Sequence, residues 1–163
     1  MAIDDVVAGL REELAELERE LRVELPKRIG HARELGDLRE SGEYESAKDR
    51  QGFVQARITF LRGRIAELQR IDLNAIPRDR VGFGSTVHLR DEENGEEKVY
   101  RLVAAEQVDT ARGWISVAAP IGRSLSGKRA GDAVEVRTPG GTKAFTITQV
   151  HTIHDDLGEA GRA

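Results

Sequence analysis

Two carboxylates, Asp37 and Glu40, stand three residues apart in the segment G-D-L-R-E-S-G-E-Y, which covers residues 36–44. On a turn or on the first turn of a helix, this spacing places both carboxylates on the same side. Together they make a partial Mg²⁺ site, because Mg²⁺ prefers octahedral oxygen ligands and commonly takes one or two carboxylates from a protein. Such a site would hold the ion only weakly until a partner supplied the remaining oxygens.

A simpler interpretation fits the same two residues. D-x-x-E is also the pattern of a helix N-cap followed by a glutamate at the third helical position, where Asp37 and Glu40 would bind backbone N–H groups. From residue types alone, capping is favoured over metal binding. In the same way Ser41 fits a helix start, and Gly42 fits a permissive turn.

Apolar residues repeat at the 4-3-4 spacing of a coiled-coil seam on both sides of this motif. Antiparallel packing that sets Leu10 against Leu68 centres the bend near residue 39, so the motif is predicted to lie at the tip of a helical hairpin. The repeats are Leu10, Leu14, Leu17 and Leu21 before the motif, and Ile58, Leu61, Ile65 and Leu68 after it.

Charged residues beside the seam give a second prediction of its register. Glu13 is expected to face Arg64, and Glu20 to face Arg57. Each exposed pair would contribute only ~0.2–1 kcal/mol, so the pairs select a register more than they add stability. Because Pro26 removes a helical hydrogen bond in the first arm, a kink or local unwinding is expected there.

Composition limits the class of protein. With 163 residues, 33% of them charged and only 4% aromatic, two modest domains fit better than one large core. The absence of cysteine excludes a thiolate zinc site, disulfides and cysteine nucleophiles. The acidic N-terminus and the lack of an apolar run of ~18 residues predict a cytoplasmic protein with no membrane partner. The net charge of −4 gives no case for autonomous binding of duplex nucleic acid.

After residue 76 the periodicity changes from helical to strand-like. We predict an α+β protein, in which the helical hairpin is followed by an antiparallel β-sheet of about five strands with one short helix beginning at Pro120. The predicted boundaries are 1–76 for the hairpin, 77–154 for the sheet domain and 155–163 for a disordered tail.

Four segments of the chain resemble, in sequence, order and spacing, segments of the bacterial Gre transcript cleavage factors of the GreA type. The resemblance covers the chain from about residue 10 to residue 150. It is carried by A-R-E-L-G-D-L-R-E-S-G-E-Y-E-S-A-K-D-R-Q-G-F (32–53), V-G-F-G-S-T-V (81–87), I-S-V-A-A-P-I-G-R-S-L-S-G-K (115–128) and V-R-T-P-G-G (136–141).

The resemblance implies an accessory factor with no complete active site of its own. Its coiled coil would enter the secondary channel of a backtracked bacterial RNA polymerase, and an FKBP-like C-terminal domain would dock at the channel rim. Asp37 and Glu40 would help to hold a second catalytic Mg²⁺ and an attacking water, so that the polymerase cleaves its own backtracked RNA near the 3′ end. The isolated chain, expected to be a monomer, would bind no Mg²⁺ stably.

The resemblance also implies roles for residues around the tip and in the second domain. Tyr44 has an alternative role as a seam residue that packs on Leu35, and the docking segment has an alternative as a buried helical turn. The implied contacts with RNA or polymerase are Arg33, Lys48 and Arg50; the tip-supporting residues are Arg39, Ser41, Glu43 and Tyr44; the rim-docking residues are Ser116, Ala119, Pro120, Ile121 and Leu125.

The chain departs from the family motif at three positions. Ser41 and Gly42 stand where Asn and Ala are usual, and Arg39 stands where Ser or Lys is usual. Arg39 could pair with a carboxylate and compete with the metal. The alternative function is therefore a non-cleaving regulator or inhibitor that occupies the same channel; the retained Asp37 and Glu40 argue against it. A prolyl isomerase lacks support, because the chain has few aromatic residues to line a pocket.

Overall fold

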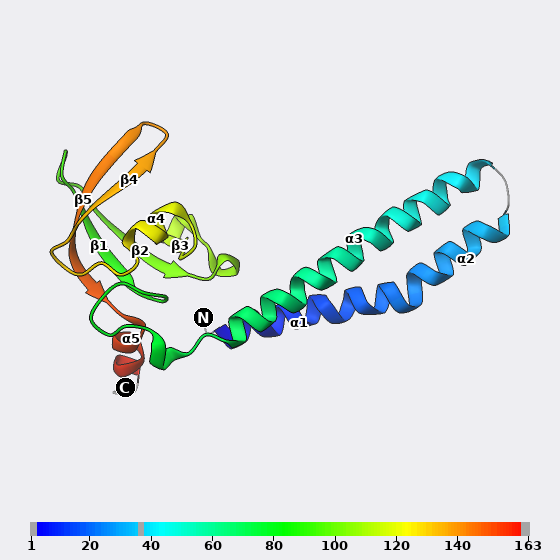
Figure 1. Ribbon diagram of the computed structural model, residues 1–163, viewed down its shortest axis with the longest axis horizontal. Coiled ribbons are helices and arrows are strands. Elements are labelled where there is room, and N and C mark those ends of the chain that lie inside the picture. Colours follow the sequence, from blue (N-terminus) through cyan, green and yellow to red (C-terminus); the bar gives the residue numbers. More distant parts are fainter. Residues whose placement is uncertain (1–2, 36–37, 161–163) are drawn as a thin grey trace. The chain divides into compact units, whose positions relative to one another are not determined.

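The computed structural model describes residues 3–35 and 38–160 and divides the chain into two compact units, Met1–Ile71 and Asp72–Ala163. The first unit is a helical hairpin and the second contains a curved β-sheet (Figure 1). The predicted α+β class is confirmed. None of the helices in these described residues has the length and apolar content needed to cross a bilayer.

The two arms of the hairpin run antiparallel (Figure 1). The second arm is a single helix of 32 residues, which at 1.5 Å per residue extends roughly 48 Å. The first arm is interrupted by a π-helical turn. The elements are α1 Ile3–Arg19, the π-helical turn Glu20–Glu24, α2 Leu25–Leu35 and α3 Leu38–Gln69.

The π-helical turn ends two residues before Pro26. The local unwinding expected near Pro26 is therefore confirmed. The N–H of Leu25 donates to the carbonyl of Glu20, five residues back, and Pro26 has no N–H to continue the ladder. The wider turn also takes up one extra residue. As a result Leu25 is fully buried in the seam, whereas Glu24, which the unbroken heptad would have placed there, is exposed.

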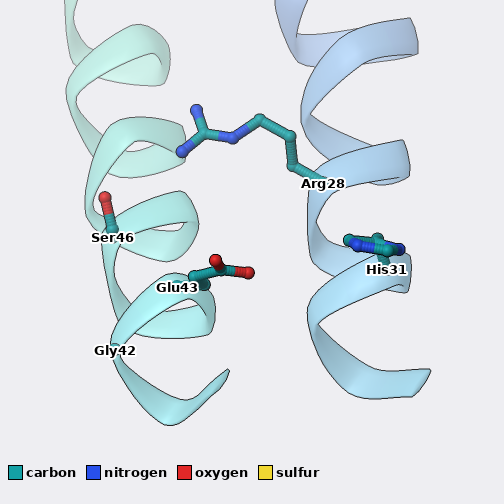
Figure 2. A pocket seen from close by; sticks show the side chains of 5 residues that line it. All are labelled: Arg28, His31, Gly42, Glu43 and Ser46. Carbon is teal, nitrogen blue, oxygen red and sulfur yellow. The ribbon is translucent and has the colours of Figure 1, made fainter. Parts of the chain in front are cut away.

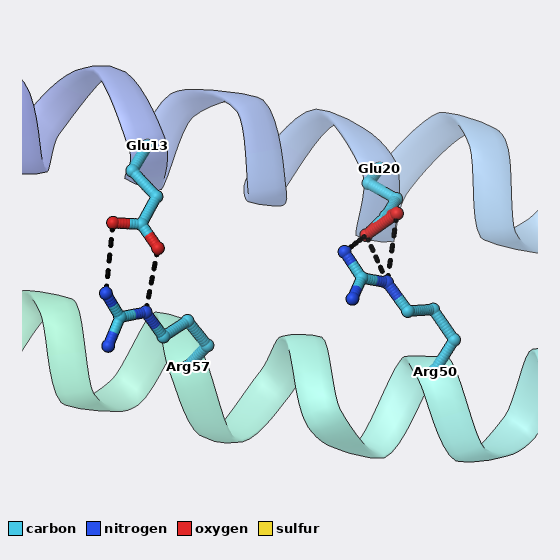
Figure 3. Close-up of polar contacts among 4 residues, drawn as sticks. All are labelled: Glu13, Glu20, Arg50 and Arg57. Carbon is cyan, nitrogen blue, oxygen red and sulfur yellow. Dashed lines mark hydrogen bonds and ion pairs between the residues drawn. The ribbon is translucent and has the colours of Figure 1, made fainter.

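Ion pairs join the two arms, one heptad away from the expected partners. Glu13 binds Arg57 at 2.7 Å and Glu20 binds Arg50 at 3.1 Å (Figure 3). The predicted partnerships of Glu13 with Arg64 and of Glu20 with Arg57 are therefore wrong. The prediction set a positions against a positions, whereas antiparallel helices set a against d, which moves the flanking g–g partners by a full heptad.

The second unit is built on a five-stranded sheet with the order β3-β2-β1-β5-β4. The predicted all-antiparallel arrangement is wrong at one edge, because β3 pairs in parallel with β2. Two short 3₁₀ turns between these strands return the chain to the same end of the sheet. The strands are β1 Thr86–Asp91, β2 Glu97–Val103, β3 Trp114–Ser116, β4 Ala133–Thr138 and β5 Gly141–His151, and the turns are Ala105–Gln107 and Thr110–Arg112.

Alternate residues of these strands form one apolar core, which α4 Pro120–Leu125 covers. The helix approaches closely because residue 122 is a glycine: a Cβ there would lie 2.3 Å from the Ser116 carbonyl oxygen. The fully buried members of the core are Val87, Leu89, Leu102, Leu125 and Ile147, with Val81 almost fully buried.

The ends of the second unit differ from the predicted boundaries. The structure has a helix, α5 Ile153–Ala160, where a disordered tail was predicted from residue 155. Asp155 caps this helix by accepting a hydrogen bond from the Thr152 N–H at 2.8 Å. The unit also begins earlier than residue 77, because Ile76 is buried and its carbonyl lies 2.8 Å from His154 Nε2.

Candidate functional site at the hairpin tip

The two predicted metal ligands fall where α2 ends at Leu35 and α3 begins at Leu38. Asp37 lies outside the described residues. Glu40 falls in the first turn of α3, and its side chain, like those of Arg39 and Ser41, also lies outside them. A carboxylate in the first turn of a helix is favoured by the helix dipole. This position suits capping as well as metal binding.

A polar cleft opens between the arms next to this tip (Figure 2). Glu43 extends from α3 toward His31 of α2, and Arg28 extends from α2 toward the α3 backbone near Ser46. The residues that line the cleft carry one carboxylate, one guanidinium, one imidazole and one hydroxyl, and Gly42 contributes only backbone. Glu43, predicted as tip support, is thus placed in this cleft.

Sequence reasoning did not single out Arg28 and His31. Both are exposed and lie on α2, three residues apart. Antiparallel pairing across the bend puts residues 28 and 31 close to residues 46 and 43. Two sequence features could have identified Arg28 and His31: the register of the hairpin, and the i, i+3 spacing of two nitrogen-bearing side chains on one helix.

Tyr44 and Arg33 form a contact across the hairpin near the tip. The Arg33 guanidinium carbon lies 5.7 Å from the centroid of the half-buried Tyr44 ring. Hydrogen bonding and charge from Arg33 lower the pKa of the Tyr44 hydroxyl below its ordinary value. The contact places the exposed Arg33 guanidinium beside the Tyr44 ring. The predicted packing of Tyr44 on Leu35 involves a side chain outside the described residues.

The other two predicted basic contacts have different environments. Arg50 lies farther from the tip, and its Nε donates to both carboxylate oxygens of Glu20 at 3.1 Å. Lys48 is exposed and donates to Gln51 Oε1 at 3.2 Å. The charge of Arg50 is compensated within the hairpin, whereas Lys48 keeps a positive charge that faces solvent.

The predicted docking segment in the second unit is divided between surface and core. Pro120 is exposed at the first position of α4, and Ser116 and Ala119 are half-buried beside it. Ile121 is half-buried and packs on the core. Leu125 is fully buried, so its assignment to a docking surface is wrong: its spacing from Ile121 reflects the inward face of α4.

Among the residues described, no three His, Cys, Asp or Glu side chains gather as a group that could hold a metal ion. The donor types at the tip are carboxylates, which are oxygen ligands of the kind that Mg²⁺ takes. These residues fit a contribution of one or two ligands to a shell that another molecule completes.

Comparison with known proteins covers both units. The family model "Transcription elongation factor, N-terminal" matches residues 5–69, and "Transcription elongation factor, GreA/GreB, C-term" matches residues 76–152. The chain is 40% identical over 146 residues to transcription elongation factor GreA of Rhodospirillum rubrum, covering 90% of this chain and 93% of that protein. It is 43% identical to GreA of Pseudomonas aeruginosa, with 89% and 92% covered.

A solved structure of the GreA factor homolog Gfh1 from Thermus thermophilus is 27% identical, covers 89% of this chain and 94% of that chain, and superposes with a TM-score of 0.41.

The chain has two units with separate cores. The first is a helical hairpin with carboxylates in its tip sequence, and the second is a small unit with a mixed sheet; together they define a two-domain class of protein. Both parts match the same family of transcription factors. The chain belongs to the GreA/GreB transcription elongation factor family.

Proposed function

We propose that this protein enters the secondary channel of bacterial RNA polymerase with its hairpin and stimulates the polymerase to cleave its own backtracked RNA. The observation that carries the proposal is the hairpin, whose long second arm begins within the D-L-R-E motif. A slender two-helix rod can deliver side chains into a passage that a globular domain cannot enter. Family membership supports the same activity.

In this proposal Asp37 and Glu40 would contribute ligands to a Mg²⁺ ion held jointly with the polymerase. When bound, such an ion stabilises the attacking and leaving oxygens of a phosphoryl transfer. The chain itself supplies two negative charges at the end of a rigid support, and the polymerase and the RNA supply the remaining oxygens. The protein would therefore be an accessory factor, acting as a monomer in the cytoplasm, and not an enzyme by itself.

The basic residues beside the tip would contact the RNA 3′ end or the channel wall. Lys48 and Arg33 are suited to this role, because their positive charges are not bound to carboxylates of the hairpin in the described contacts. Arg50 is less suited, because Glu20 already compensates it. In the second unit Pro120, with Ser116, Ala119 and Ile121 around it, would dock at the channel rim.

The proposal is tested by RNA cleavage in stalled, backtracked polymerase complexes across a Mg²⁺ titration. Wild-type protein should shorten the RNA from its 3′ end. The variant Asp37→Asn plus Glu40→Gln keeps side-chain size but removes both charges, and it should lose most of the stimulation while still competing with wild type for the polymerase. Stimulation that survives loss of both charges would contradict the proposed metal role.

The second candidate function is a channel-occupying regulator that does not stimulate cleavage. The sequence feature that favours it is Arg39, a cation between the two carboxylates. Under this alternative, wild-type protein would inhibit transcription and leave backtracked RNA intact at every Mg²⁺ concentration. Arg39→Ser would then restore cleavage, whereas under the leading proposal it would only lower the Mg²⁺ concentration required.

A further inference from the structure

Two half-buried histidines, His88 of β1 and His151 of β5, lie against each other on the sheet of the second unit. Their ring centroids are 6.0 Å apart, and the ring planes meet at 66°. The two strands are hydrogen-bonded neighbours, and the residue opposite His88 is Gln149, two positions before His151. Because residues two apart on a strand share a face, the two imidazoles and the Gln149 side chain stand on the same face of the sheet.

This face is the one turned away from the apolar core. Val87 and Leu89, on either side of His88 in β1, are fully buried in that core, so His88 lies on the opposite face. Val99 of β2, which pairs with His88 from the other side, is 48% exposed, and Gln149 is exposed as well. A small ion can therefore reach the two rings from solvent.

Gln149 places a side-chain amide at the exposed edge of the His151 ring. Its Nε2 lies 2.7 Å from Nε2 of His151. An amide nitrogen is a donor, so Nε2 of His151 accepts with its lone pair, which is also the lone pair that a metal ion would take. Turning the amide over exchanges its nitrogen and its oxygen, so the same side chain can offer an oxygen ligand at this place.

The charged neighbours on this face balance one another. Arg90, two residues after His88, is opposite Glu97 in the strand register. Arg101 is ion-paired to Asp156 at 3.6 Å. Each arginine therefore has an acid beside it, and the two rings are not surrounded by uncompensated positive charge that would repel a cation.

We propose that His88 and His151, with the amide oxygen of Gln149, form a site for a divalent transition-metal ion of the Zn²⁺ or Cu²⁺ class. Imidazole suits these ions, whereas Mg²⁺ takes carboxylate and water oxygens. Metal–nitrogen bonds of about 2.0–2.1 Å place two ligating imidazole centroids about 5 Å apart, roughly 1 Å closer than here. Rotation about the soft χ2 torsions of the rings supplies this movement, and water completes the shell.

The strength expected of the site follows from its ligands. Two imidazoles and one neutral oxygen are fewer strong ligands than the four of a structural zinc site, so the ion should exchange with solvent. Once one ring holds the ion, the other meets it at high effective concentration, because neighbouring strands hold the two together. The bound ion would link β1 to β5 and stabilise the folded sheet unit. The site lies apart from the tip and does not depend on the proposed function.

Titration of the full chain with Cu²⁺ in excess Mg²⁺, followed by electron paramagnetic resonance, tests the proposal. Wild-type protein should bind one Cu²⁺ that is coupled to the nitrogens of two imidazoles, and it should melt at a higher temperature when loaded. His88→Gln and His151→Gln should each raise the dissociation constant at least ~10-fold, because one ring alone loses the chelate. His31→Gln is the matched control, because His31 is an exposed histidine of α2, and it should change nothing.

A gain of affinity makes the proposal testable even if loss of a ring perturbs the strands. Gln149→Glu exchanges a neutral oxygen ligand for a charged one on the exposed face, so it should bind the ion several-fold more tightly. Thermal unfolding without metal checks that each variant folds. Affinity that survives the loss of either ring, that falls equally in His31→Gln, or that does not rise in Gln149→Glu would overturn the proposal.

Discussion

The Arg57 side chain of α3 donates two hydrogen bonds to the Glu13 carboxylate of α1, from Nε at 2.7 Å and from a terminal nitrogen at 3.1 Å (Figure 3). The same arrangement recurs one heptad along each arm, between Arg50 and Glu20. These two pairs lie on one flank of the seam, and Arg62 with Glu18 joins the arms as well. The pairs fix the register that sets where the bend falls.

The Glu13–Arg57 pair predicts how hairpin stability depends on pH. The hydrogen bonds from Arg57 hold the pKa of Glu13 below its ordinary value of 4.5, and the charge of Arg57 acts in the same direction. Because the pKa is depressed in the folded state, the stabilisation is present above pH 4.5 and is lost as the pH falls through the folded-state pKa. Both side chains are more than a third exposed, so the effect should be only ~0.2–1 kcal/mol.

Thermal unfolding followed by circular dichroism between pH 7 and pH 3 measures this effect. Glu13→Gln should lower stability at pH 7 and flatten the acid limb of the curve. Glu12→Gln is the matched control, because Glu12 is exposed on the same helix and belongs to none of the ion pairs described. A curve for Glu13→Gln that parallels the wild-type curve at every pH would contradict the assigned role.

The hairpin was predictable from sequence because a heptad period survives in the burial of α3 from Ala47 to Leu68. The partners of Glu13 and Glu20 follow from the rule that antiparallel helices set a against d, which the prediction did not apply. Beyond Glu24 the pairing also depends on the residue that the π-helical turn adds, which spacing alone does not show. Because the partners differ by one heptad, Glu20 pairs with Arg50. Arg50 is therefore charge-compensated within the hairpin, unlike the exposed basic residues near the tip.

The sheet unit shows a different limit of prediction. Strands with alternating burial, such as β4, were found from their period, whereas the direction of β3 was not. Three residues carry too little periodicity, and the 3₁₀ turns that reverse the chain leave no apolar pattern. At the tip, the residue types of Asp37 and Glu40 alone favour capping, and the expectation of metal binding comes from the family resemblance.

The π-helical turn predicts a tolerated deletion. Removing Glu24 together with Pro26→Ala should leave a continuous α-helix in which Leu25, Ile29 and Ala32 follow the heptad of the first part of the arm. We expect this variant to fold and to melt no lower than wild type, because the extra residue and the missing N–H are both removed.

Deletion of Glu16 is the matched control for this experiment. It removes one residue from a regular part of α1 and shifts Leu17 and Leu21 out of the seam, so it should lower the unfolding free energy by several kcal/mol. Equal loss of stability in the two deletions, measured by urea unfolding, would show that the π-helical turn does not absorb an extra residue.

Gly42 predicts a gain in stability near the tip. It lies in the second turn of α3, is exposed, and a Cβ there would meet no atom within 4 Å. Gly42→Ala should therefore stabilise the hairpin by ~0.5–1 kcal/mol through the unfolded state and helix propensity. If the first turn of α3 positions Glu40 for metal binding, the same variant should also stimulate cleavage at a lower Mg²⁺ concentration.

Gly9→Ala is the control, because Gly9 is equally open but lies in the interior of α1, far from the tip. It should raise the melting temperature by a similar amount and leave the Mg²⁺ dependence of cleavage unchanged. A shift in Mg²⁺ dependence in both variants would trace the effect to overall stability and not to the tip.

Pro120 and Leu125 belong to the same short helix but should fail in different assays. Leu125 is fully buried in the core, so Leu125→Ala should lower the unfolding free energy of the sheet unit by ~2–5 kcal/mol. Pro120 is exposed at the first position of α4, so Pro120→Asp, which suits a helix N-terminus, should leave stability nearly unchanged.

If this surface docks on the polymerase, Pro120→Asp should instead weaken binding, and cleavage should recover at saturating protein concentration. Competition binding to polymerase, measured beside thermal unfolding of each variant, separates the two effects. Wild-type affinity for Pro120→Asp would mean that docking uses another surface of the second unit.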